Sequence, residues 1–127
     1  MNDAEKFELG VADFNAGRFF EAHEVWEELW LAAAEPEKTF LQGLIQIAAA
    51  FHHHGRRNAR GTESLLAAGI LKLTGCPDDF RGVAIAELRK EAEEWIETLR
   101  GGEKVESQDL PKIRAANANA AKRKRGG

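Results

Sequence analysis

The sequence predicts an all-α protein, a compact bundle of about five helices with the helix over about residues 37–56 at its centre. Strand signals are nearly absent, because the chain has no tyrosine and no alternating run of β-branched residues. Apolar residues instead recur at helical spacing along almost the whole chain. Residues 40–51 are apolar except for Gln42 and Gln46. A helix that is apolar nearly all round belongs in the middle of a bundle.

Turn signals divide the first half of the chain into three helices. The first is predicted over about residues 4–16, and the sequence Asn15-Ala16-Gly17 ends it. The second covers about residues 19–33. Pro36 suits the first turn of a third helix, over about residues 37–56.

Two more helices are predicted in the second half. Thr62 is expected to cap a fourth helix that runs to Leu73, because Gly75 and Pro77 then end it. Asp78-Asp79 is expected to cap a fifth helix. Its apolar stripe consists of Ile85, Leu88, Ala92, Trp95, Ile96 and Leu99.

The composition changes after Gly102, where we predict a domain boundary. Residues 1–102 are expected to form a single all-α domain. Residues 103–127 are expected to form a polar, basic and partly disordered tail that ends in Lys122-Arg-Lys-Arg125. Within that tail, Leu110-Pro111-Lys112-Ile113 suits a short extended anchor that packs back on the body.

Composition and charge exclude several classes of protein. No run approaches the ~20 apolar residues of a membrane span, and the N-terminus lacks the features of a secretory signal. Cys76 is the only cysteine, which excludes an intramolecular disulfide and a thiolate metal cluster and predicts a cytoplasmic location. Residues 1–100 hold 11 Lys and Arg against 18 Asp and Glu, whereas residues 101–127 hold 7 against 3. An acidic body makes nucleic acid an unlikely main ligand and leaves only weak contact by the basic tail.

Residues 21–30 point to a candidate site, since they set ionisable groups beside tryptophans on a predicted helix. Successive helical residues lie about 100° apart, so His23, Glu27 and Trp30 share one face with Trp26. An ionisable pair on an apolar face costs free energy unless it is satisfied or used. We therefore expect Glu27 to point inward beside His23. The other glutamates, Glu21, Glu24 and Glu28, are expected on a separate solvated face.

The third predicted helix carries a matching polar face, formed by Gln42, Gln46 and His53 and flanked by the small residues Gly43 and Ala49. Close packing of this face on the second helix would bring it towards the His23–Glu27 pair. The basic turn that follows is a candidate anion clamp, although cations also suit the C-terminal end of a helix. The candidate ligand-binding residues are His23, Glu27, Trp30, Gln42, Gln46, His53, Arg57 and Asn58.

A subset of these residues, His23, Glu27 and His53, has the chemistry of a divalent metal site, because imidazole and carboxylate groups ligate metals. A divalent metal ion is the one cofactor that this set would suit. Carboxylate sites in helical bundles use more inward acids than Glu27 alone. The sequence His23-Glu24-x-x-Glu27 also lacks the second histidine of the zincin pattern His-Glu-x-x-His.

Two motifs make the chain resemble a known family. The first reads Phe14-Asn15-x-Gly17-x-Phe19-Phe20-Glu21-Ala22-His23-Glu24-x-Trp26-Glu27, and the second combines Phe40-Leu41-Gln42-Gly43-Leu44-Ile45-Gln46 with Ala49-Ala50, His53, Asn58 and Gly61. Over about residues 5–100 the chain resembles the bacterial and archaeal family called domain of unknown function 309 (DUF309). The resemblance implies a small helical fold and a His-x-x-x-Glu-x-x-Trp signature, met by His23, Glu27 and Trp30. It implies no established activity and does not reach the tail.

Three functional interpretations stay open at this point. In the first, a small polar or anionic molecule binds near His23, Glu27, Gln46 and His53. In the second, the protein is a metal-dependent enzyme, such as a hydrolase, that uses the His/Glu set. In the third, it is a structural or interaction module: His23 and Glu27 form an i,i+4 pair that only specifies packing, and the bundle forms a homo-oligomer.

Overall fold

The computed structural model of the chain describes residues 1–101 and 109–116. Its elements are α1 (Asp3–Asn15), α2 (Phe19–Ala32), α3 (Glu37–Gly55), α4 (Ala59–Thr74), the short 3-10 turn η1 (Phe80–Gly82) and α5 (Ile85–Arg100). These described ranges contain no strand, only an isolated bridge between Val83 and Ala115. The prediction of an all-α bundle is confirmed. None of the described helices is long and apolar enough to cross a membrane.

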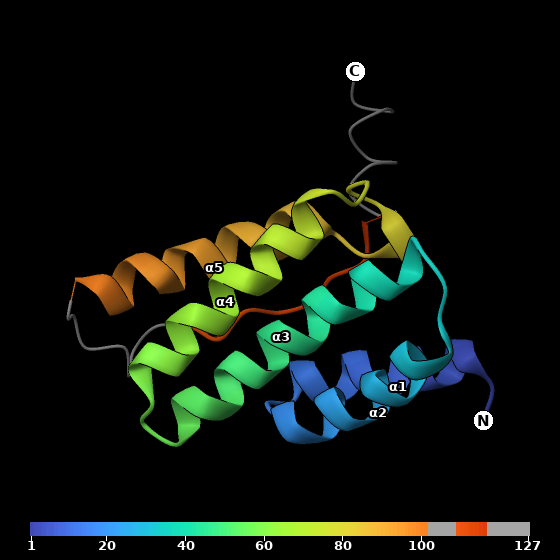
Figure 1. The fold of residues 1–127 in the computed structure, drawn as a ribbon, viewed down its shortest axis with the longest axis horizontal. Coiled ribbons are helices and arrows are strands. Elements are labelled where there is room, and N and C mark those ends of the chain that lie inside the picture. Colours follow the sequence, from blue (N-terminus) through green and yellow to red (C-terminus); the bar gives the residue numbers. More distant parts are fainter. Residues whose placement is uncertain (102–108, 117–127) are drawn as a thin grey trace.

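The third helix, α3, is the centre of the bundle (Figure 1). It packs against α2 and α4, while α1 packs on α2 and α5 packs on α4. Eight of its 19 residues are buried, including Leu41, Leu44 and Phe51. Because apolar side chains occur on most of its circumference, α3 can bury contacts with two neighbours at once. The prediction of a central apolar helix is confirmed.

Two glycines let α3 and α4 approach closely. A Cβ atom on Gly69 would lie 2.7 Å from Cγ1 of Ile47 and 2.9 Å from the carbonyl oxygen of Gly43. A Cβ atom on Gly43 would lie 2.8 Å from the side chain of Leu73 on α4. Gly43, which the sequence places at the edge of the polar face of α3, therefore packs against α4.

The starts of α4 and α5 differ from the predicted ones, because their capping groups lie elsewhere. Asn58 caps α4: its side-chain oxygen accepts a hydrogen bond from the Gly61 N–H at 3.0 Å. Thr62, the predicted cap, is buried one turn later and donates its hydroxyl to the Asn58 carbonyl at 2.7 Å. Asp78 does cap α5, but it does not directly precede the helix. Its carboxylate accepts a hydrogen bond from the N–H of Ala86, eight residues later, at 2.5 Å. The chain between Asp78 and Ala86 forms η1 instead of the first turn of α5.

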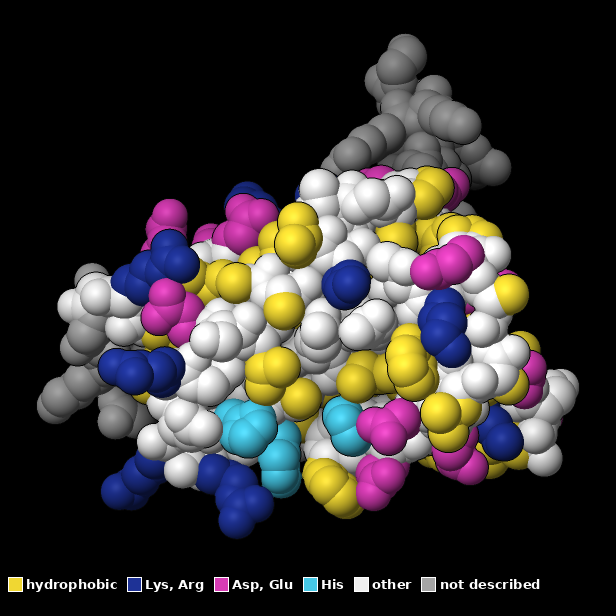
Figure 2. Space-filling view, viewed as in Figure 1, with side chains coloured by type: hydrophobic (Ala, Val, Ile, Leu, Met, Phe, Trp, Pro, Cys, Tyr) yellow, Lys and Arg dark blue, Asp and Glu magenta, His cyan; other side chains and the backbone are white. Residues whose placement is uncertain are grey.

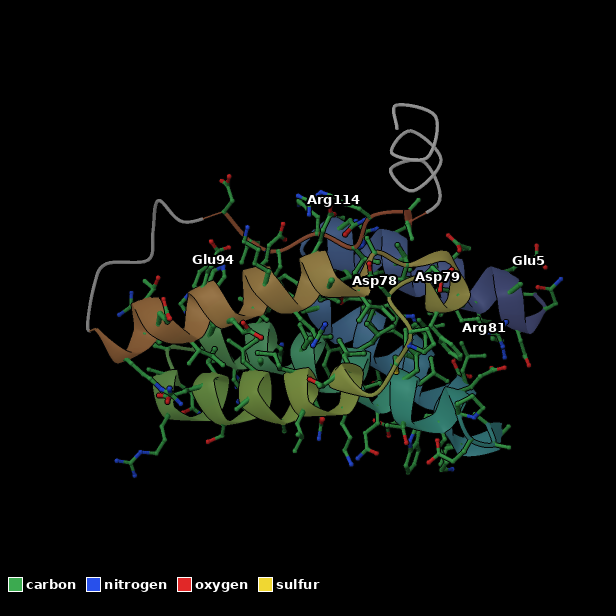
Figure 3. The ribbon with its side chains drawn as sticks, turned by 90° about the horizontal axis from the view of Figure 1, so that it is seen from above. Glu5, Asp78, Asp79, Arg81, Glu94 and Arg114 are labelled. Carbon is green, nitrogen blue, oxygen red and sulfur yellow. The ribbon has the colours of Figure 1, made fainter. Side chains whose placement is uncertain are left out.

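Residues 109–116 form an extended segment, the C-terminal strap, that packs back on the bundle beside α5 (Figure 3). Pro111 and Ile113 are buried. The side chain of Asn15 donates to the Ile113 carbonyl at 2.9 Å and accepts from the Ile113 N–H at 2.8 Å. The predicted anchor around Ile113 is therefore present. The rest of the predicted tail, including Lys122-Arg-Lys-Arg125, lies outside the described residues.

Glu35 supplies the cap that the Pro36 side chain cannot give to α3. Its carboxylate accepts from the N–H of Thr39 at 2.8 Å and from the Thr39 hydroxyl at 2.7 Å. These two hydrogen bonds, the hydroxyl one being the larger cause, hold the pKa of Glu35 below its usual range. A lowered folded-state pKa gives stability that is present above the unfolded pKa and is lost as pH falls through the folded value.

We therefore expect Glu35→Gln to lower the free energy of unfolding at neutral pH, and the difference from wild type to shrink between about pH 5 and pH 3. Urea denaturation at a series of pH values measures this difference. Thr39→Val removes one of the two donors and should reproduce part of the same pH-dependent loss. A difference that stays constant from pH 7 to pH 3 would contradict the capping role of the carboxylate.

Candidate functional site

His23 and Glu27 form the expected i,i+4 pair on α2. The Nε2 atom of His23 lies 3.2 Å from the Oε2 atom of Glu27. The Glu27 side chain is nevertheless 48% exposed, whereas that of His23 is 29% exposed. The expectation that Glu27 points inward is wrong. α2 turns Phe19, Ala22 and Trp26 into the core, and Glu27 follows Trp26 directly, so it is rotated about 100° away from the buried face.

Three buried polar atoms on α2 and α3 have no hydrogen-bond partner among the described residues. They are His23 Nδ1, Trp30 Nε1 and Gln46 Oε1. The Phe19 and Phe51 rings meet 5.4 Å apart, and this antiparallel pairing of α2 with α3 brings His23 level with Gln46. An unpaired buried polar atom costs about 1–3 kcal/mol. Of the four such atoms in the described chain, only Arg89 Nε lies outside the predicted site.

Trp30 and Gln42 lie nearer the α2–α3 turn and are partly buried. The Nζ atom of Lys38 lies 4.1 Å from the centre of the Trp30 ring and donates to the Trp30 carbonyl at 3.1 Å. A cation over an aromatic face is attracted by the ring quadrupole. Lys38 therefore already covers the indole face that would otherwise be open to a ligand.

Histidine side chains gather on one face of the molecule, over the C-terminal half of α3 and the neighbouring part of α2 (Figure 2). Phe20 is 48% exposed and joins them. Its ring is stacked on His23, with centroids 6.3 Å apart, and lies 5.4 Å from the ring of His52. The ring of His53 follows at 6.1 Å from His52. The face thus combines an exposed aromatic ring with three imidazoles.

The turn between α3 and α4 is a Schellman motif, in which backbone N–H groups close the end of α3. Asn58 N–H donates to the His53 carbonyl at 3.1 Å, and Arg57 N–H donates to the His54 carbonyl at 2.9 Å. Arg57 takes the left-handed position of this motif, with φ of 60°, where glycine is the usual residue. The Asn58 amide nitrogen also lies 3.5 Å from His53 Nδ1. The backbone N–H groups of Arg57 and Asn58 therefore close α3, and the Asn58 side chain lies beside His53.

Three arginines at this turn make no ion pair or side-chain hydrogen bond with any described residue: Arg56, Arg57 and Arg60, all of them exposed. The other described arginines are all engaged. Four pair with a carboxylate, as Arg18–Asp13, Arg81–Glu37, Arg100–Glu63 and Arg114–Glu91, and Arg89 donates to Thr74. We call the surface formed by His23, Gln46, His52, His53, Arg56, Arg57 and Arg60 the histidine–arginine face.

The predicted metal set does not assemble. Within residues 1–101 and 109–116, no group of three His, Cys, Asp or Glu side chains is placed to hold a metal ion. His23 and Glu27 are adjacent, but His53 lies two turns beyond Gln46 along α3 and contacts Asn58 instead.

Sequence reasoning placed Phe20 on the helix face of His23 and named the basic turn as a candidate anion clamp. Its set of candidate ligand-binding residues nevertheless left out Phe20, His52, Arg56 and Arg60. The triple His52-His53-His54 was a signal, but consecutive helical residues diverge, and His54 faces α5, 5.0 Å from the ring of Trp95. The lack of partners for Arg56 and Arg60 depends on the folded structure, so no sequence pattern could have revealed it.

The segment that carries this face matches a known protein family. The family is described as Domain of unknown function (DUF309), and the match covers residues 7–65. These residues belong to the DUF309 family. The DUF309 segment runs from α1 into α4 and holds every predicted site residue, whereas α5 and the C-terminal strap lie outside it.

Two relatives are uncharacterised proteins. One, from Aquifex aeolicus (strain VF5), is 34% identical over 101 residues, which are 79% of this chain and 30% of that protein. The other, "Uncharacterized protein YpuF" of Bacillus subtilis (strain 168), is 39% identical over 62 residues, which are 47% of this chain and 36% of that protein. The matches thus span about a third of the length of these relatives.

Proposed function

We propose that the histidine–arginine face binds a small anionic molecule, one that carries a phosphate or carboxylate group. One observation carries the proposal: the only described arginines without a partner lie together at one corner, the α3–α4 turn, of an acidic chain. Like charges held close together repel one another, and an anion between them removes that repulsion. Guanidinium groups also bind carboxylate and phosphate oxygens with two parallel hydrogen bonds.

Helix capping explains only part of the cluster. Arg56 and Arg57 follow the C-terminal end of α3, where the helix dipole favours cations. Arg60 lies in the first turn of α4, where the dipole disfavours them. Arg57 further holds a left-handed backbone conformation that costs a non-glycine residue about 1 kcal/mol. Arg57 and Arg60 therefore have reasons to be present that local structure does not supply.

Unpaired polar atoms further along the same face favour a ligand that extends from the anion towards α2. His23 Nδ1 and Gln46 Oε1 are buried without a partner, and a bound molecule that approached them would offer the missing hydrogen bonds. Phe20 and His52 give an exposed aromatic edge to the same surface. These groups favour a ligand with polar atoms beyond its charged group.

Two variants test the proposal, with inorganic pyrophosphate as the probe in calorimetric titrations at low ionic strength. Arg60→Gln should weaken binding about tenfold, because a charge-assisted contact is lost. Arg57→Gly should weaken binding while raising the free energy of unfolding by roughly 0.5–1 kcal/mol, since glycine relieves the left-handed strain. Weaker binding together with higher stability in Arg57→Gly would show that the Arg57 side chain contacts the ligand and does not stabilise the fold.

Lys90→Gln serves as the matched control, because Lys90 is an exposed cation on α5, remote from the face. It should leave pyrophosphate binding unchanged. Equal weakening by Lys90→Gln and Arg60→Gln would mean that only overall charge attracts the anion. Absence of saturable binding to the wild-type protein would refute the proposal directly.

A further inference from the structure

A cavity lies at the opposite end of α3 from the arginines. It has a volume of about 640 Å³ and is formed by the first turns of α1, the end of α2, the α2–α3 connection and the start of α3. Arg81 of η1 reaches it from far along the chain (Figure 3). Cavities of roughly 300–1,000 Å³ are the usual size for small-molecule sites.

The floor of this cavity is apolar and aromatic. Phe7 and Phe40 line it, and their ring centroids lie 5.8 Å apart. The rest of the apolar lining consists of Leu29, Leu41, Ala4, Ala32, Ala33 and Ala34. An aromatic face attracts a cation through its quadrupole, while the leucines favour an apolar body on the same ligand.

The rim is acidic, with five carboxylates against Lys6 and Arg81. Three of the five have structural explanations. Glu35 caps α3 through Thr39, Glu37 pairs with Arg81, and Asp3 lies in the favourable first turn of α1.

Glu8 and Glu28, the remaining two, have no such explanation. Neither makes an ion pair or side-chain hydrogen bond with any residue in the described ranges. Glu28 lies near the C-terminal end of α2, where the helix dipole disfavours an acid. Both residues line the cavity.

We propose that this cavity binds an organic cation, an ammonium group carried on an apolar or aromatic body. Glu8 and Glu28 meet the charge, and the partly buried Phe7 ring meets the apolar body and adds a cation–π contact. The site is distinct from the histidine–arginine face and takes a ligand of the opposite charge, so it stands independently of the anion proposal.

The test compares two probes of nearly equal size, 2-phenylethylammonium and the neutral 2-phenylethanol, by nuclear magnetic resonance titration of the labelled protein. The ammonium probe should shift the backbone amide signals of Leu29, Ala32 and Ala33, which line the cavity, in a saturable way. The alcohol should bind at least fivefold more weakly, because it leaves the carboxylates unpaired. Equal affinities, or no saturable shift at these amides, would overturn the proposal.

Charge-neutral variants test the rim. Glu28→Gln and Glu8→Gln should each weaken binding of 2-phenylethylammonium about fivefold and leave 2-phenylethanol unaffected. Glu24→Gln is the matched control, since Glu24 is an exposed acid one turn earlier on α2 and does not line the cavity. Identical effects of Glu24→Gln and Glu28→Gln would show that the rim carboxylates do not contact the cation.

Discussion

Gly10→Ala should destabilise the bundle strongly, although alanine is the better helix former. A Cβ atom on Gly10 would lie 2.1 Å from Nε1 of Trp26 and 2.5 Å from its Cε2 atom. The Trp26 ring is fully buried between α1 and α2, and its Nε1 donates to the Phe7 carbonyl at 3.3 Å. The ring cannot retreat without losing that hydrogen bond and displacing Phe14, whose ring lies 6.1 Å away.

The sign of the change in stability depends on two opposing contributions, helix propensity and overpacking. Replacing glycine by alanine inside a helix gains about 1 kcal/mol, whereas overpacking of this severity costs about 3 kcal/mol or more. We therefore expect the free energy of unfolding to fall by at least about 2 kcal/mol and the Tm to fall by roughly 8 °C. Thermal and urea denaturation followed by circular dichroism measure both quantities.

Gly55→Ala is the matched control, because Gly55 is also helical but a Cβ atom added to it would meet no atom within 4 Å. It should be neutral or slightly stabilising. Trp26→Leu should reduce the further loss caused by Gly10→Ala, since the smaller side chain vacates the space that the new methyl group needs. If Gly10→Ala proved as stable as the wild type, the close packing of Trp26 on α1 would be incorrect.

The sequence predicted most of the fold because its helices are specified by local patterns. The apolar run 40–51 identified the central helix, and the turn at Asn15-Ala16-Gly17 separated α1 from α2. The starts of α4 and α5 were misjudged because their caps depend on tertiary geometry. Asp78 reaches across a folded loop to Ala86, and nothing in a linear pattern distinguishes it from a local cap.

The candidate site was predictable only in part. Helical spacing brought His23 and Glu27 together, but the burial of Glu27 depended on which neighbours cover α2. The absence of partners for Arg60 among the described residues follows from where the acidic side chains of the fold lie. The cavity at the other end of α3 draws its rim from separate helices, with Glu8 on α1 and Glu28 on α2, and no short sequence window contains both.

Asn15 joins α1 to the C-terminal strap through Ile113, and its replacement is the second change for which we expect a large effect. Its side-chain amide pairs with both backbone groups of Ile113, as a neighbouring β-strand would, because it donates to the carbonyl and accepts from the N–H. The strap also covers Trp95 on α5, whose Nε1 donates to the Asp109 carbonyl at 2.9 Å. Asn15→Leu removes both side-chain hydrogen bonds and leaves the Ile113 N–H and carbonyl groups unpaired in a partly buried place.

We expect Asn15→Leu to weaken docking of the C-terminal strap by about 2 kcal/mol, roughly 1 kcal/mol for each hydrogen bond lost. Asn15→Asp keeps the acceptor for the Ile113 N–H and loses only the donor, so its effect should be intermediate. The indole N–H signals of the tryptophans report the difference by nuclear magnetic resonance. The Trp95 signal should shift and lose protection from hydrogen exchange as the strap is released, whereas the Trp26 signal, whose partner is Phe7, should stay unchanged. Equal changes at both indoles would mean that Asn15 stabilises the whole bundle and not the strap.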